Sequence, residues 1–103
     1  MRSANIFMHA KLAGVLEELE PGKHYRFIYS NGYKDEPISL TMPTDTHTYE
    51  FNRFPPFFDG LLPEGIMLDG LLRQQKIDKS DFFSQLLAVG QELVGAVTVE
   101  EIL

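Results

Sequence analysis

Residues 54–63 read FPPFFDGLLP and separate two halves of the chain with different character. This segment holds three Phe, three Pro and two Leu within ten positions. Two adjacent prolines, Pro55 and Pro56, set the backbone φ near −65° and remove two N–H donors, so we expect no regular structure over residues 52–60. Strand signals dominate before this segment and helix signals dominate after it, which predicts an α+β fold.

The first half predicts a small, mostly antiparallel sheet or partial barrel. Short apolar or alternating runs indicate strands at residues 5–10, 13–19, 24–29 and 37–42. Residues 13–19 also place apolar side chains at helical spacing, so a helix stays an alternative there, although Gly14 favours the strand. Pro21-Gly22 predicts a turn, and Asn31-Gly32 is a strong hairpin signal. Residues 43–47 are expected to be a loop and residues 48–51 to be extended.

The second half predicts two helices and a returning strand. The first helix is expected over residues 63–75, with Pro63 in its first turn and Glu64 near the positive end of its dipole. A connector at residues 76–79 leads to a second helix over residues 80–89. Ser80 is the expected N-cap of that helix, and Gly90 is its expected C′ residue. Small and β-branched residues over 95–99 predict the final strand.

Composition limits the classes of function. The chain has 103 residues, of which 44% are hydrophobic and 23% charged, so we expect one globular domain over residues 1–103. The net charge of −6 argues against direct binding of nucleic acid. The absence of cysteine excludes disulfides, thiolate zinc sites and Cys nucleophiles. No run of apolar residues resembles a transmembrane segment or a signal peptide, so we expect a cytoplasmic protein without membrane contact.

The sequence carries no motif that predicts catalysis. His47 follows Asp45 by two residues and is the best candidate metal ligand, but no other ligand stands at metal-binding spacing from it. No nucleophile elbow and no phosphate-binding glycine loop is present. We therefore expect no catalytic residues, no metal and no cofactor, and predict that the protein is not an enzyme.

The proline-rich segment has two interpretations. Its aromatic rings either anchor the segment to the core or present apolar surface to a partner, and rigidity favours the second role because less entropy is lost on binding. Phe54 and Leu62 are the candidate core residues. Phe57 and Phe58 are adjacent and are expected to point apart, so at least one of them is a candidate for partner contact.

Three motifs resemble the N-terminal subdomain of HipA-type serine/threonine kinases. They are FFDGLLPEG at 57–65, DFFSQLLAVG at 81–90 and GAVTV at 95–99, and the strands expected upstream fall in the matching order. The resemblance extends over residues 5–100, but the chain ends where the kinase core of that family begins. A free-standing copy of the subdomain is similar to the HipS family, the small component of three-gene HipBST toxin–antitoxin systems.

The resemblance implies an antitoxin that binds and inhibits a HipT-like kinase in trans, within a complex that includes a HipB-like DNA-binding protein. An activating subunit of such a kinase and a binding module for an unrelated partner stay open as alternatives. The expected partner-binding residues lie in and after the proline-rich segment: Phe57, Phe58, Asp59, Leu61, Pro63 and Glu64.

Overall fold

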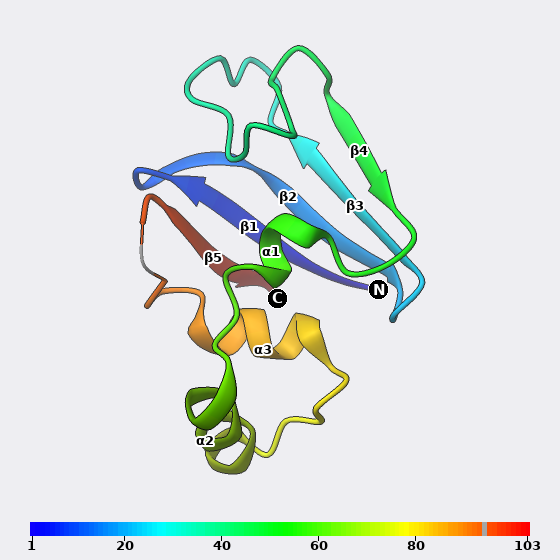
Figure 1. Ribbon diagram of the computed structural model, residues 1–103. Helices are drawn as coiled ribbons and strands as arrows, with labels where there is room; N and C mark the ends of the chain where they lie inside the picture. Colours follow the sequence, from blue (N-terminus) through cyan, green and yellow to red (C-terminus); the bar gives the residue numbers. More distant parts are fainter. Residues whose placement is uncertain (94) are drawn as a thin grey trace.

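The computed structural model describes residues 1–93 and 95–103. Within these residues, five strands form one open antiparallel sheet in the order β4-β3-β2-β1-β5 (Figure 1). The strands are β1 (Arg2–Met8), β2 (Lys11–Glu20), β3 (His24–Tyr29), β4 (Thr48–Phe51) and β5 (Val97–Ile102). The helices are α1 (Pro56–Asp59), α2 (Gly65–Gln75) and α3 (Phe82–Val89). The predicted α+β class is confirmed.

The ambiguous segment at residues 13–19 is a strand, as the presence of Gly14 favoured. It forms the middle of β2, which pairs with both β1 and β3. A Cβ at Gly14 would lie 2.3 Å from the carbonyl oxygen of Ile28 and 2.8 Å from the ring of Phe27. Only glycine fits this position, because those atoms belong to the neighbouring strand.

Aromatic side chains of β3 form the centre of the core. Tyr25, Phe27 and Tyr29 alternate along the strand and are buried, as the alternation predicted. Phe27 packs edge-on against Tyr29 at 4.8 Å between ring centroids and contacts Phe58 of α1 at 6.1 Å. The core therefore joins the proline-rich segment to the middle of the sheet.

The predicted strand at residues 37–42 is wrong. Residues 30–47 form a long loop rather than the tight hairpin that Asn31-Gly32 indicated. A turn is present at its start, in which Gly32 has a φ of 79° and the Tyr33 N–H donates to Ser30 O. The Tyr29 hydroxyl accepts from the Ile38 N–H at 3.1 Å and donates to the carbonyl of Met42 at 2.5 Å. This buried hydroxyl organises the loop, while the edge of β3 pairs with β4 instead.

Two helix boundaries in the middle of the chain differ from the predictions. Residues 56–59 form a single helical turn, α1, where we expected no regular structure. Pro56 starts this turn because the first helical residues need no N–H partner. α2 begins at Gly65 rather than at Pro63, since Glu64 has an extended backbone and serves as N-cap without a side-chain hydrogen bond.

The ends of α3 are also made differently from the prediction. The N-cap is Asp81 rather than Ser80, because the Asp81 carboxylate accepts from the Ser84 N–H at 3.1 Å while Ser80 binds Asp78. Gly90 follows the helix as expected, but its φ of −53° is right-handed rather than the left-handed conformation usual for a C′ glycine. Glycine is needed at position 90 for a different reason: a Cβ there would lie 2.2 Å from the carbonyl oxygen of Val99 in β5.

Candidate partner-binding surface

An ion-pair cluster joins α3 to the sheet. The Arg2 guanidinium donates to Glu18 at 2.8 Å, to the Ser84 hydroxyl at 2.6 Å and to Asp81 at 2.8 Å. It also lies 5.0 Å from the ring centroid of Phe83. Glu18 is only 3% exposed and additionally accepts from the Tyr25 hydroxyl at 3.3 Å, so its carboxylate is fully partnered. This cluster fixes the position of α3.

The electrostatics of the cluster favour its charged form. The hydrogen bond to Glu18 raises the pKa of Arg2 above its ordinary range, although burial opposes the charge. Burial also disfavours ionised Asp81, but hydrogen bonds from Arg2 and Ser84 outweigh it and hold the pKa of Asp81 below its usual value. Arg2 and Asp81 are therefore both ionised near neutral pH.

The two adjacent phenylalanines differ in burial, but their rings contact each other and do not point apart as we expected. Phe58 is 0% exposed and sits in the core, whereas Phe57 is half-buried and contacts it edge-on at 5.1 Å. Phe58 therefore offers no surface to a partner and anchors α1. Phe54 is buried as predicted, but Leu62 is only half-buried. Phe58, rather than Leu62, is the second core anchor of the segment.

The other expected partner-binding residues lie together along the chain between α1 and α2. Asp59 and Glu64 are exposed, while Leu61 and Pro63 are half-buried. Leu61 packs at the margin of the core cluster. These residues connect directly to a surface that the motif-based reasoning missed, namely the apolar side chains of α2.

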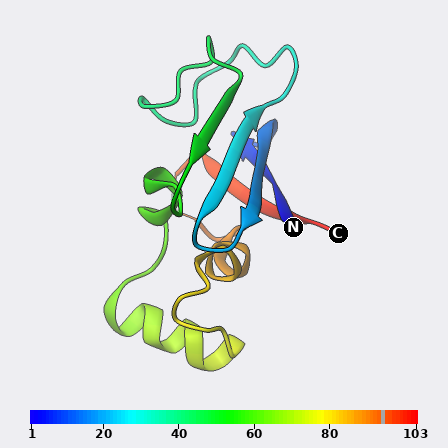
Figure 2. The same cartoon turned by 90° about the vertical axis from the view of Figure 1, so that its right-hand side faces the viewer.

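α2 is described in full, and none of its residues is buried. Ile66 is 88% exposed and Met67 is 74% exposed. Figures 1 and 2 show α2 beyond α3, on the side away from the sheet. Apolar residues at 66, 67, 68, 71 and 72 cover much of the helix circumference. This distribution is the sequence signal that could have predicted the exposed surface, because a helix with apolar residues around much of its circumference needs apolar contacts on more than one side.

A groove runs along α2 and faces the end of α3; we term it the α2 groove. It consists of two adjoining hollows of about 530 Å³ and 360 Å³. Both are lined by Pro63, Met67, Val89 and Glu92. Arg73 lies at one part of the rim and Gly60 at the other end. The expected partner residues Leu61 and Pro63 thus form one wall of a larger apolar surface.

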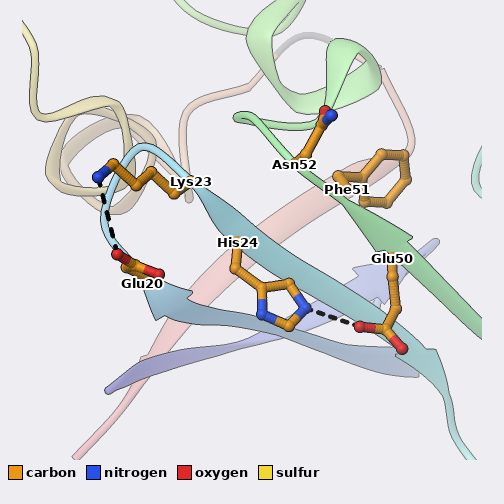
Figure 3. A pocket seen from close by; sticks show the side chains of 6 residues that line it. All are labelled: Glu20, Lys23, His24, Glu50, Phe51 and Asn52. Atoms are coloured by element: carbon orange, nitrogen blue, oxygen red, sulfur yellow. Dashed lines mark hydrogen bonds and ion pairs between the residues drawn. The ribbon is translucent and has the colours of Figure 1, made fainter.

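A separate hollow of about 700 Å³ lies where β3 begins and β4 ends (Figure 3). Its charged side chains pair with one another: His24 with Glu50 at 2.7 Å, and Lys23 with Glu20 at 4.0 Å. The hydrogen bond from His24 lowers the pKa of Glu50. Within the described residues, no three His, Asp or Glu side chains converge as metal ligands. The charged side chains of this hollow thus pair with one another.

The fold and the exposed α2 groove define a small α+β domain with a surface suited to protein contact. The family model of the HipA N-terminal domain matches residues 4–100. The chain therefore belongs to the HipA N-terminal domain family.

Two further similarities agree with this membership. The N-terminal domain of the HipA toxin superimposes with a TM-score of 0.78 and 28% sequence identity, covering 100% of this chain and 94% of that one. An uncharacterised protein of Haemophilus influenzae is 34% identical over 101 residues, which is 98% of this chain and 93% of that protein. No helix among the described residues is both long and apolar enough to cross a membrane.

Proposed function

We propose that this protein is a HipS-like antitoxin, which binds a HipA-like (HipT) serine/threonine kinase in trans and inhibits it without catalysis of its own. The observation that supports this proposal is the exposed apolar surface of α2, adjacent to the half-buried residues Leu61 and Pro63. In the HipA toxin, this type of domain is the N-terminal part of the kinase chain. A related kinase that lacks the domain would keep the surface to which the separate domain can bind.

The exposure of α2 is costly for an isolated protein. Ile66 and Met67 are large apolar side chains in water, and burying one such side chain contributes about 1.5–3 kcal/mol. An exposed apolar patch rimmed by polar residues is typical of a protein–protein interface. Contact with a partner kinase would bury these side chains, together with Phe57 at the margin of α1.

The segment between α1 and α2 is suited to hold this surface in place. Pro55, Pro56 and Pro63 restrict its backbone, and Phe58 anchors it in the core. A pre-ordered surface loses less conformational entropy on binding. We propose that Phe57, Asp59, Leu61, Pro63 and Glu64 contact the kinase next to α2, while Phe58 acts from the core.

The remaining parts of the proposal rest on the resemblance to the HipA family. Residues 1–103 act as one domain, and the complex forms in the cytoplasm, where the kinase has access to ATP. The resemblance to three-gene systems implies that a HipB-like DNA-binding protein completes the assembly and supplies the contact to DNA. The net charge of −6 agrees with this division, since it makes this chain a poor ligand for a polyanion.

The experiment replaces Ile66 and Met67 with Asp and measures binding to the kinase encoded beside this protein. Both side chains are exposed, so the double variant is expected to fold with an unchanged circular dichroism spectrum. We expect binding to weaken about 100-fold or more, because the interface would then bury two charges. Leu40→Asp is the matched control, since Leu40 is 96% exposed in the loop at the opposite end of the molecule (Figure 1).

Unchanged binding of the folded double variant, or an equal loss in the Leu40→Asp control, would contradict this docking surface. Phosphotransfer by the kinase with and without the wild-type protein tests the direction of the effect. A decrease supports inhibition, whereas an increase would identify an activating subunit instead.

A further inference from the structure

Two of the eight glycines have no explanation in the fold. A Cβ at Gly14 or Gly90 would collide with a neighbouring strand, and four other glycines have a positive φ: Gly22, Gly32, Gly65 and Gly95. Gly60 and Gly70 have neither property. A Cβ at Gly60 would be 3.4 Å from the nearest atom, which is ordinary contact, and a Cβ at Gly70 would meet nothing within 4 Å.

Both glycines cost stability where they are. Gly70 lies inside α2, where glycine is the least favourable residue after proline. Gly60 has a right-handed backbone with φ −65° and ψ −15°, which alanine adopts without strain. The free domain therefore gains nothing from the missing side chains.

The two positions share a location. Gly60 lines one hollow of the α2 groove and Gly70 lines the other. On the helix surface, residues three and four positions away surround Gly70, and these are Ile66, Met67, Arg73 and Gln74. All four line the same hollow as Gly70. The absence of side chains at Gly60 and Gly70 thus makes the groove deeper next to exposed apolar side chains.

We propose that Gly60 and Gly70 are close-approach points, at which the main chain of one segment of the kinase crosses the α2 groove. This inference rests on the proposed function and adds the chemistry of the partner segment. The segment carries apolar side chains, which pack on Met67 and Val89 in the lining of the groove. Its backbone fits against α2 because no Cβ stands between them.

The charges at the rim complete the description of the partner. Arg73 on α2 and Glu92 after α3 both line the groove. A complementary segment has an acidic residue facing Arg73 and a basic residue facing Glu92. Electrostatic complementarity of this kind fixes the register of a bound segment and suppresses other partners.

The test substitutes Gly70 and Gly60 separately with Ala and measures thermal stability and kinase affinity on the same preparations. Alanine is expected to raise Tm by roughly 2–5 °C, because it favours the helical backbone at both sites. Affinity for the kinase is expected to fall about tenfold, with a larger loss for Gly70→Leu. Stability and binding thus move in opposite directions.

Asp69→Ala is the matched control, because it also places alanine in α2 but at an exposed position that does not line the groove. It is expected to raise Tm slightly and to leave the affinity unchanged. Arg73→Glu tests the charges and is expected to weaken binding, whereas Lys79→Glu in the connector before α3 is not.

The outcomes separate this inference from the proposed function. Gly60→Ala and Gly70→Ala variants that are more stable and bind as tightly as wild type would overturn the close-approach points, while binding itself would stand. Loss of affinity in Asp69→Ala equal to that in Gly70→Ala would also overturn them. A wild-type protein that does not bind the kinase would instead contradict the proposed function.

Discussion

At the scale of single residues, the Arg2 cluster shows what a linear sequence hides. Arg2 and Asp81 are 79 positions apart, yet their side chains lie 2.8 Å from each other. The Glu18 carboxylate is buried in the core, where it accepts hydrogen bonds from Arg2 and from the Tyr25 hydroxyl. Nothing in the spacing of these residues indicates their convergence, since it depends on β1, β2 and α3 meeting at one point.

The cluster predicts a specific dependence of stability on pH. The pKa of Asp81 is lower in the folded state than in the unfolded chain, so its ionisation stabilises the fold above the ordinary Asp pKa of about 3.9. This contribution is lost as pH falls through the folded pKa. Asp81→Asn keeps an N-cap but removes the titration.

We therefore expect the unfolding free energy of wild type to exceed that of Asp81→Asn by a constant amount above about pH 5. The difference should shrink as pH falls below about 4, as seen in urea unfolding at a series of pH values. Two curves that stay parallel down to about pH 2 would show that Asp81 does not contribute in this way.

Adjacent residues also take opposite roles, as Phe57 and Phe58 show. Phe58→Ala removes a fully buried ring and is expected to cost about 3–5 kcal/mol of unfolding free energy. Phe57→Ala removes a half-buried ring and is expected to cost roughly half as much, while it weakens kinase binding. Chemical denaturation of both variants checks the first expectation, and titration of folded Phe57→Ala with the kinase checks the second. Equal destabilisation by the two substitutions would contradict this division of roles.

At the scale of elements, local patterns predicted those structures whose cause is local. Alternating aromatics in residues 24–29 predicted β3 with its observed bounds, because one face of that strand is buried along its whole length. Residues 38–42 also alternate apolar with polar side chains but lie in a loop. There the decisive contact is the Tyr29 hydroxyl, which binds the backbone at Ile38 and Met42. A tertiary hydrogen bond of this kind leaves no trace in strand propensity.

The helices show the same limit. α2 and α3 were predicted but α1 was not, and the first residues of α2 and α3 depended on capping contacts that were assigned to the wrong side chains. Ser80 and Asp81 are both residue types that favour the N-cap position. Asp81 is the N-cap because it accepts from the Ser84 N–H, and Arg2 also holds its carboxylate in place. The candidate site was predicted in part. The segment before α2 was recognised by its prolines. The exposure of Ile66 and Met67 could not be predicted, because it depends on the position of α2 relative to α3.

At the scale of the whole molecule, the protein has a body built around one core and a helix, α2, that lies outside that core. The sheet, α1 and α3 share the core, and the Arg2 cluster joins α3 to the strands. α2 lies outside this body (Figure 2). Its apolar side chains Ile66 and Met67 are exposed, as the proposed function requires. Membership of the HipA N-terminal domain family is the reason for proposing a HipA-like kinase as the docking partner.

The most direct test of this account is a titration of the neighbouring HipA-like kinase with the purified wild-type protein, monitored by phosphotransfer from radiolabelled ATP. We predict that phosphotransfer falls to background at a stoichiometric ratio and that a complex of both proteins elutes as one species in gel filtration. Phosphotransfer that is unchanged or raised at a large excess of this protein would contradict the claim that it inhibits a kinase by binding to it.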